Sequence, residues 1–234
     1  MRLSPGRAAR RCGKTVYVGY YRWLYGRAFP GADRAQAAVE RLEGRLGHGD
    51  TPAEQRVWEE KVADGRWDYM RELHESPRYA TVATMVNALG GSEASIFDVG
   101  CGEGLLVDHL RRFGYREYLG LDIAEQAILD AAGRRDEHTD FVAADAETFT
   151  PGEGRTFDVI VLNECLCYFR DPLATVDRFA GLLAPGGSLV ASTFRTPRHD
   201  AIARLVAGRY DVVEEITVGN RLGTSLVRVL KPPR

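Results

Sequence analysis

Glycines and carboxylates are concentrated in the short run from Asp98 to Gly104, which reads Asp-Val-Gly-Cys-Gly-Glu-Gly. Glycines let a backbone turn tightly and approach a ligand with no side chain in the way. A dinucleotide fingerprint needs its third glycine at the position of Leu105, and a phosphate-cradling P-loop needs a Gly-Lys-Ser/Thr ending. The carboxylate of Glu103 would repel a phosphate but tolerates an ammonium group. The run therefore predicts a loop for a zwitterionic ligand.

Two further carboxylates follow short apolar stretches that we predict to be strands. Asp122 follows the stretch 117–121, and Asp145 follows the stretch 140–143. An open α/β sheet binds its ligands beyond the carboxyl ends of its strands. We therefore expect both carboxylates to lie at the same edge of the sheet as Asp98.

From Ser95 onward, β-branched runs alternate with amphipathic stretches, the pattern of a parallel sheet covered by helices. The last two predicted strands are joined by so short a connection that they must be antiparallel. We predict an α/β fold with a seven-stranded, mostly parallel sheet, an antiparallel last strand, helices on both faces and an N-terminal helical cap. The predicted strands are 95–99, 117–121, 140–143, 157–162, 187–193, 211–218 and 224–230, and the predicted helices of this part are 105–113, 124–134, 172–183 and 199–207.

The N-terminal part lacks these alternating β-branched runs and has helical patterns instead. We therefore divide the chain into a helical arm and cap at 1–90 and a Rossmann-like domain at 91–234. The arm from Arg2 to Arg27 is basic and rich in tyrosine. Helical spacing and capping residues predict cap helices at 33–47, 51–63 and 76–89. We expect the aromatic residues of this segment to pack over the strand ends and to wall a substrate pocket.

Composition narrows the class of protein. The chain has 234 residues, 44% hydrophobic and 27% charged, with a formal net charge of -2. This balance disfavours nucleic acid as a partner, because nucleic-acid binders usually carry a clearly basic face. There is no apolar run long enough for a membrane span and no secretory signal, so we expect a cytoplasmic protein. The four cysteines, among them Cys165 and Cys167, lack the paired spacing of a zinc site, and we predict no metal.

The run 96–106 resembles motif I of the class I methyltransferases that use S-adenosyl-L-methionine, and later motifs follow in register. In that family an acid after the second strand binds the ribose hydroxyls, and an acid after the third lies beside the adenine. Asp122 and Asp145 match these positions, and the run 183–187, Leu-Ala-Pro-Gly-Gly, precedes the fifth strand as in the family. The resemblance implies S-adenosyl-L-methionine as cofactor. We expect Asp98 to order the glycine loop through backbone amides and to reach the ammonium of the cofactor directly or through water. The expected cofactor-binding residues are Arg78, Asp98, Gly100, Cys101, Gly102, Gly104, Asp122, Ile123, Asp145, Ala146 and Asn163.

The methyl acceptor is expected beside the loop after the fourth strand. The stretch 163–169 is similar to that of nodulation-type N-methyltransferases and related small-molecule enzymes. The runs 67–69 and 78–79 also resemble the entry of that group, where an arginine and aromatic residues lie near the cofactor carboxylate, which implies this place for Arg78. Glu164 and Tyr168 are the candidate catalytic residues. Glu164 would hold an ammonium or take a proton, with helix capping as its alternative role.

These features predict a methyltransferase that acts on an oxygen or nitrogen of a small molecule, for example in secondary metabolism. Two alternatives stay open at this point. The basic arm would suit an RNA or protein methyltransferase, and the fold would also suit an enzyme that keeps the cofactor while catalysing a non-methylating reaction. The acceptor, the need for a general base and the oligomeric state are not determined by the sequence.

Overall fold

The computed structural model describes residues 55–233, together with 30–31, 34–35, 38 and 41. The basic arm and Cys12 lie outside the described residues, and so does the predicted helix at 33–47 apart from its isolated described positions. None of the helices in the described part of the chain has the length and apolar character needed to span a bilayer.

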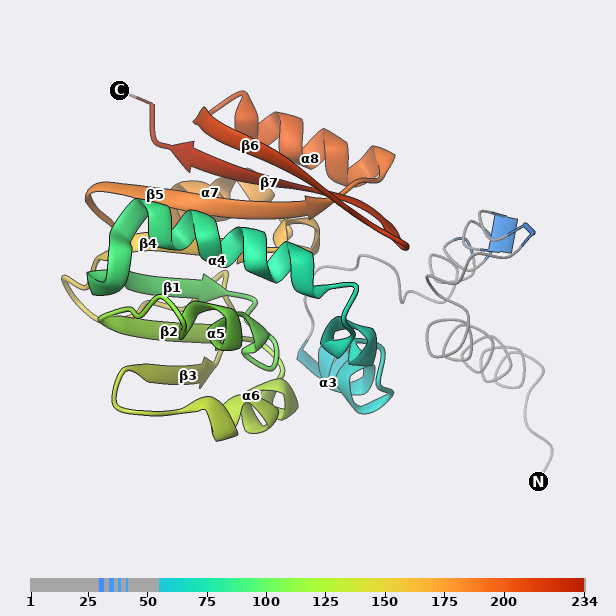
Figure 1. Ribbon diagram of the computed structural model, residues 1–234, viewed down its shortest axis with the longest axis horizontal. Helices are drawn as coiled ribbons and strands as arrows, with labels where there is room; N and C mark the ends of the chain where they lie inside the picture. The colour runs from blue at the N-terminus through green and yellow to red at the C-terminus, as the bar shows by residue number, and fades with distance from the viewer. Residues whose placement is uncertain (1–29, 32–33, 36–37, 39–40, 42–54, 234) are drawn as a thin grey trace.

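A single seven-stranded sheet forms the centre of the molecule, with strand order β3-β2-β1-β4-β5-β7-β6 (Figure 1). Strands β1 to β5 pair in parallel, and β7 is antiparallel to both β5 and β6. The predicted fold class is therefore confirmed. The strands are β1 (Ser95–Val99), β2 (Glu117–Asp122), β3 (Thr139–Ala143), β4 (Phe157–Asn163), β5 (Leu183–Phe194), β6 (Asp211–Asn220) and β7 (Gly223–Lys231).

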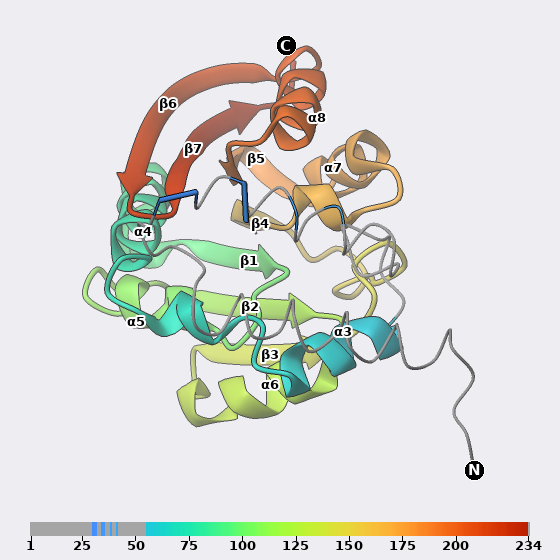
Figure 2. The same ribbon diagram turned by 90° about the vertical axis from the view of Figure 1, so that its right-hand side faces the viewer.

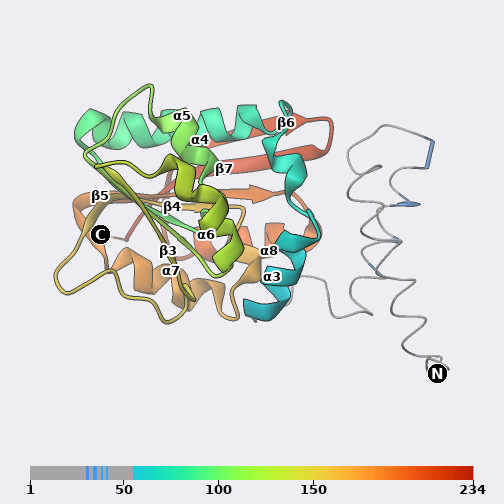
Figure 3. The same ribbon diagram turned by 90° about the horizontal axis from the view of Figure 1, so that it is seen from below.

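Helices cover both faces of the sheet, as Figure 3 shows from below. On one face lie α4, α5 and α6, and on the other lie α7 and α8. The helices are α3 (Gln55–Ala63), α4 (Ser76–Gly90), α5 (Leu105–Leu110), α6 (Glu125–Ala131), α7 (Pro172–Ala180) and α8 (Pro197–Ala207), and short 3-10 turns are η1 (Asp68–Arg71), η2 (Gly91–Glu93), η3 (Ala132–Arg134) and η4 (Leu166–Tyr168).

Successive side chains of a strand point to opposite faces of the sheet, so the apolar core forms two layers, one on each face. In β1, Ile96 packs beneath α4 and α5, whereas its neighbour Phe97 packs against α7. Both side chains are almost fully buried. Because successive strand residues point to opposite faces, β1 contributes to both layers of the core and fixes the end of the strand from which Asp98 and the glycine loop emerge.

Helix α3 is anchored at the start of α6. The Glu59 carboxylate accepts hydrogen bonds from the backbone N–H groups of Glu125, at 2.6 Å, and Gln126, at 3.3 Å. An acceptor at a helix N-terminus satisfies amides that have no partner within the helix. This contact holds α3 beside the carboxyl ends of the strands (Figure 2). Trp58 of α3 packs with Ala124 and Ala127 at the start of α6.

Helix α4 was placed in the cap from the sequence, but it packs into the core. Val82, Ala83 and Val86 are buried against the sheet, in one cluster with residues of β1 and α5. The division of the chain near residue 90 stays a prediction, and we propose that the cap ends before α4, because this helix contributes to the main core.

Gly104 supplies a stability prediction. Its φ is +75°, and a Cβ atom built on it would lie 2.6 Å from the ring of Phe141. Gly104→Ala should lower the free energy of unfolding by about 1–3 kcal/mol, because it adds backbone strain and overpacks the core. Urea denaturation measures this loss. Gly133→Ala is the matched control, since a Cβ there meets no atom within 4 Å. Equal stability of the two variants would contradict the packing argument.

Candidate functional site

A cleft opens at the carboxyl ends of the central strands, with an empty volume of ≈ 1330 Å³ that includes its open mouth. A concave site at the strand ends is where an open α/β sheet binds its ligands. Of the predicted site residues, all line this cleft except Gly104. Gly104 instead begins α5 behind the loop, which gives it a packing role rather than a ligand contact. The remaining assignments of individual residues stay predictions about binding.

The glycine loop is held by acceptors on the neighbouring strand β2. The amides of Gly100 and Cys101 donate to the Leu121 carbonyl at 2.7 and 2.9 Å, and the Gly102 amide donates to Asp122 Oδ2 at 2.9 Å. A Cβ on Gly102 would meet no atom within 4 Å, so the backbone there borders open space. A ligand can approach this stretch of main chain closely.

Asp122 lines the cleft and also accepts hydrogen bonds from two backbone amides of the protein. Its Oδ2 accepts from Gly102, and its Oδ1 accepts from the Ala124 amide at 3.0 Å, just before α6. Burial raises the pKa of the Asp122 carboxyl, and these amides oppose that shift. Since a carboxylate oxygen can accept more than one hydrogen bond, both oxygens keep acceptor capacity for ligand hydroxyls.

We expected Asp98 to order the glycine loop through backbone amides, and this prediction is wrong, because neither carboxylate oxygen accepts from an amide of the loop. Its Oδ2 accepts from the Tyr118 hydroxyl at 2.6 Å. Its Oδ1 is buried and has no hydrogen-bond partner in the described part of the chain. Burial raises the pKa of Asp98 to about 7, with Asp122 adding to this shift and Tyr118 and Arg78 opposing it. A buried, unsatisfied acceptor on the cleft is costly unless a ligand supplies a donor.

The loop after β3 lies on another side of the cleft. Asp145 Oδ1 accepts from the Glu147 amide at 2.8 Å, which closes a tight turn. Arg178 of α7 donates to the carbonyls of Ala146 and Phe149 and thereby holds the loop from behind. Because the Glu147 amide is used within the turn, the Ala146 amide is the better donor for a ring nitrogen of a ligand.

Arg78, Asn163 and Glu164 form a buried polar cluster at the centre of the cleft. Arg78 Nη1 donates to Asn163 Oδ1 at 2.5 Å, and Arg78 Nε lies 3.9 Å from Glu164 Oε1. Burial alone would lower the pKa of the Arg78 guanidinium, but its neighbours, including Glu164 and Glu75, reverse this and raise it. Arg78 is therefore a fixed cation of the site.

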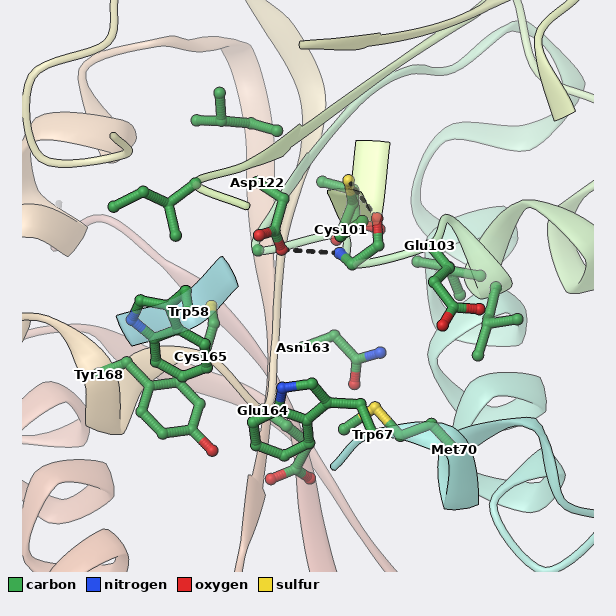
Figure 4. Close-up of a pocket in the computed structure, with 18 of the residues that line it drawn as sticks. Trp58, Trp67, Met70, Cys101, Glu103, Asp122, Asn163, Glu164, Cys165 and Tyr168 are labelled. Atoms are coloured by element: carbon green, nitrogen blue, oxygen red, sulfur yellow. Dashed lines mark hydrogen bonds between the residues drawn. The ribbon is translucent and has the colours of Figure 1, made fainter. Parts of the chain in front are cut away.

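The Glu164 carboxylate is turned away from the glycine loop (Figure 4). Its Oε1 accepts from Ser192 Oγ at 3.0 Å, and its Oε2 accepts from the Phe194 amide at 2.5 Å. Among the described residues it is the one non-glycine residue with positive φ, at 60°. Such strained backbone is often found at functional sites, but the bonds to β5 give Glu164 a structural task too. Its predicted role in catalysis stays a prediction.

An aromatic cluster forms the wall opposite the glycine loop (Figure 4). Trp58 of α3 stacks on Trp67 with ring centroids 5.9 Å apart, and Tyr168 meets Trp58 edge-on at 4.6 Å. The sequence predicted aromatic packing over the strand ends but did not select these two tryptophans as site residues. The signals for them in the sequence were the aromatic density of the segment preceding α4 and, for Trp67, the resemblance of the run 67–69 to the entry of the nodulation-type enzymes.

Arg71 and Glu103 were not predicted to pair. Arg71 Nε and Nη2 lie 2.7 Å from the two carboxylate oxygens of Glu103, in a bidentate arrangement. This geometry joins η1 to the glycine loop at the mouth of the cleft. No spacing rule connects residues so distant in the chain, so sequence reasoning could not find the pair.

Cys165 and Cys167 are buried beside the cleft. Burial raises the pKa of the Cys165 thiol well above its usual value, which disfavours the thiolate that a metal would need. A Cβ on Gly100 would lie 2.8 Å from Cys165 Cβ, so the small cysteine side chain packs under the loop.

The strand order and the glycine loop define the class of protein as a Rossmann-like methyltransferase fold. The family described as "Methyltransferase domain" matches residues 73–222, and the chain belongs to this family. The resemblance and the fold predicted from the sequence are confirmed, and the enzyme class and cofactor that accompany the family are those expected.

Several known proteins are similar to this chain. The ubiquinone biosynthesis O-methyltransferase of Neisseria meningitidis serogroup C (strain 053442) is 30% identical over 158 residues, which are 64% of this chain and 66% of that protein. The match spans less than two thirds of that relative's length. The N-methyltransferase NodS of Bradyrhizobium japonicum WM9, solved with S-adenosyl-L-homocysteine, is 22% identical with a TM-score of 0.66, and covers 77% of this chain and 98% of its own.

A third similar protein is the 1,6-didemethyltoxoflavin-N1-methyltransferase of Burkholderia thailandensis, solved with 1,6-didemethyltoxoflavin and S-adenosylhomocysteine. It is 21% identical, has a TM-score of 0.61, and covers 77% of this chain and 87% of its own. Both structural similarities establish the fold.

The buried charge of Asp98 gives a stability prediction with a defined pH dependence. The folded protein holds the Asp98 proton up to about pH 7, whereas the unfolded chain releases it near the ordinary value of 3.8 for an aspartate pKa. The ionised form therefore destabilises the fold increasingly as pH rises between these values, and no further above about 7. Asp98→Asn removes this cost while still accepting from Tyr118. We expect it to raise the unfolding free energy of the ligand-free protein by about 1–3 kcal/mol at pH 8, and by less at pH 5.

Thermal unfolding at the two pH values measures this effect. Asp211→Asn, on the exposed strand β6, is the control and should change little at either pH. A stability gain for Asp98→Asn that is equal at pH 5 and pH 8 would show that the buried charge is not its cause.

Proposed function

We propose that this chain is an S-adenosyl-L-methionine-dependent methyltransferase that methylates an oxygen or nitrogen of a small molecule. The observation that carries the proposal is the buried Oδ1 of Asp98, which has no hydrogen-bond partner among the described residues and lies on a cleft beside an open glycine loop. A carboxylate in that position suits an ammonium group, which both donates a hydrogen bond and neutralises the buried charge.

The other cleft residues fit the remaining parts of the same cofactor. Asp122 would accept from the ribose hydroxyls, and Asp145 and the Ala146 amide would recognise the adenine edge. Gly102 leaves room for the main chain to lie against the ligand. Asn163 and Arg78 would complete the amino-acid end. When bound, the cofactor supplies a methyl group on a sulfonium.

The protein's own contribution to methyl transfer is alignment and exclusion of water. The wall of Trp58, Trp67 and Tyr168 closes the cleft with apolar rings. Removing solvent strengthens the electrostatic contacts of the site and favours a productive alignment of the acceptor. Tyr168 has an edge-on contact that fixes its ring, so its hydroxyl is a candidate for orienting the acceptor.

The charge of the cleft supports a small acceptor that is neutral or cationic. Its lining contains two arginines, Arg71 and Arg78, against a larger set of carboxylates: Asp68, Asp98, Glu103, Asp122, Asp130, Asp145, Glu147 and Glu164. Away from the Arg78 guanidinium, such a surface repels phosphates and other anionic groups. This argues against RNA as the acceptor, although the basic arm on which that alternative rests lies outside the described residues.

The names of similar proteins support both oxygen and nitrogen as the atom that receives the methyl group. The Neisseria relative is named for O-methylation in ubiquinone biosynthesis, and NodS and the toxoflavin enzyme are named for N-methylation. We therefore retain oxygen and nitrogen as acceptors. A cytoplasmic location stays a prediction from the sequence.

Methyl transfer can be tested before the acceptor is identified. The protein is incubated with a metabolite extract and cofactor carrying a deuterated methyl group, and products are screened for the corresponding mass shift. A labelled product together with release of S-adenosyl-L-homocysteine is expected. Cofactor binding without any labelled product across broad extracts would favour a non-methylating reaction instead.

Asp122→Ala should weaken cofactor binding by about 1–3 kcal/mol, because the ribose hydroxyls lose a charged acceptor. Isothermal titration calorimetry with S-adenosyl-L-homocysteine measures the change. Asp130→Ala is a control, since Asp130 also lines the cleft but pairs with Gln126 on α6 at 2.9 Å. Unchanged affinity in a folded Asp122→Ala protein would contradict the assignment of the ribose site.

A further inference from the structure

The turn between β6 and β7 reaches the N-terminus of α4, far from it in sequence. Asn220 Nδ2 donates to Glu75 Oε1 at 3.0 Å and to the His74 carbonyl at 3.0 Å. Its Oδ1 accepts from the amides of Leu222 and Gly223 at 2.7 and 3.2 Å. The backbone amides of the turn require an acceptor, whereas the Glu75 carboxylate and the His74 carbonyl require a donor. These requirements fix which end of the Asn220 side-chain amide carries the oxygen and which the nitrogen.

The other carboxylate oxygen of Glu75 binds Arg78. Glu75 Oε2 accepts from Arg78 Nη2 at 2.9 Å and from Nε at 3.2 Å. Both residues are buried, at 5% and 3% exposure. A buried charge pair is favourable only when its geometry is good and its remaining polar atoms are satisfied. Asn220 satisfies the second carboxylate oxygen and so holds Glu75, and through it Arg78, in one orientation.

Arg78 in turn fixes Asn163 at the centre of the cleft. Asn163 Oδ1 accepts from Arg78 Nη1 at 2.5 Å and lies 2.6 Å from Ser192 Oγ, whose single proton it shares with Glu164 Oε1. With both donors on its oxygen, the Asn163 side chain presents its amide nitrogen to the cleft (Figure 4). The orientation of a cleft-lining donor is thus linked to the β6–β7 turn by an unbroken series of hydrogen bonds.

A surface ion pair joins the same two segments independently. Arg221 Nη2 lies 2.7 Å from Glu72 Oε2, and both side chains are about half exposed, at 50% and 56%. Exposed ion pairs of this kind contribute little to stability. Arg221 therefore offers a control for contacts that only tether the turn to the start of α4.

We propose that Asn220 and Glu75 are positioning residues, which orient Arg78 and Asn163 for binding of the cofactor. The proposal rests on the proposed function, because the cofactor is the ligand whose affinity it concerns. Neither residue lines the cleft, so their effect is indirect. The polar series, rather than the tether at the surface, carries that effect.

Asn220→Asp tests the proposal, because it keeps the oxygen that caps the turn and replaces the donor facing Glu75 by a second carboxylate oxygen. We expect the affinity for S-adenosyl-L-homocysteine to fall about tenfold, since repulsion displaces Glu75 and releases Arg78. Arg221→Ala should leave the affinity within about twofold. Calorimetry on the full chain gives both values, and thermal unfolding shows whether each variant is folded.

The double variant Asn220→Asp with Glu75→Gln is the rescue. Its new glutamine amide can donate to the new carboxylate in the turn while its oxygen accepts from Arg78. The polar series is then rebuilt, whereas the bond to the His74 carbonyl stays broken. We expect the affinity to return to within about threefold of the wild-type value. A structural role alone would not produce this recovery.

The outcomes separate the two proposals. If the wild-type protein does not bind S-adenosyl-L-homocysteine, the proposed function fails and this inference fails with it. If it binds and Asn220→Asp does not weaken binding, or Arg221→Ala weakens it equally, only the positioning role is overturned.

Should Asn220→Asp not fold, the single variant Glu75→Gln decides. The substituted side chain has one oxygen and one amide nitrogen, and in either orientation the nitrogen faces a donor, on Asn220 or on Arg78. A loss of about tenfold in affinity is therefore expected, and an unchanged affinity would overturn the proposal.

Discussion

One carboxylate oxygen of Asp98 lies buried on the cleft without a hydrogen-bond donor in the described part of the chain, and the other is held by Tyr118. An ionised carboxylate in such a place destabilises the ligand-free fold, which is why its pKa rises to about 7. The free energy lost there is recovered when a cation binds beside it. Affinity for a cationic ligand and reduced stability without it are thus two results of the same buried charge.

The surrounding structure keeps this carboxylate buried on the lining of the cleft. The glycine loop leaves β1 after Val99, next to Asp98, and is tied to β2 by the Leu121 carbonyl and by Asp122. On the far wall, α3 is fixed to the start of α6 by Glu59, which places Trp58 over the strand ends. The mouth is narrowed by the pair of Arg71 and Glu103. These contacts come from different elements, yet each one shields or shapes the same edge of the sheet.

Local patterns were sufficient to predict the sheet and its site. Strand β1 begins and ends where its β-branched and apolar run does, and the short connection at 219–223 correctly required antiparallel strands. The acids Asp98, Asp122 and Asp145 were predicted from their positions at or just after the ends of strands, because parallel strands bring their carboxyl ends to one edge. The boundary between the N-terminal cap and the main domain was harder to predict. Helix α4 has a buried face like that of a cap helix, and its packing with β1 and α5 supports our proposal that the cap ends before it.

Contacts between distant segments could not be predicted from one sequence. Asn220 looks like an ordinary turn residue, and its bond to Glu75 depends on how the β6–β7 turn meets α4 in space. The bond of Asp122 to Gly102 and the missing partner of Asp98 among the described residues are likewise products of tertiary geometry, so the sequence favoured the opposite assignment for the acid that orders the loop. Residue type and spacing indicate which groups gather at the site. They do not determine which of those groups satisfy one another and which remain for a ligand.

The buried Asp98 carboxylate is the group that we expect to receive the cationic end of the cofactor. The most direct test is the pH dependence of S-adenosyl-L-homocysteine binding, measured by calorimetry between pH 6 and pH 8.5 for the wild-type protein and for Asp98→Asn. Titration of the ligand affects both proteins alike, so the difference between them isolates Asp98. We predict that wild-type affinity gains from rising pH up to about 7 relative to the variant, because the carboxyl must first lose its proton. Parallel pH profiles with similar affinities would contradict the account.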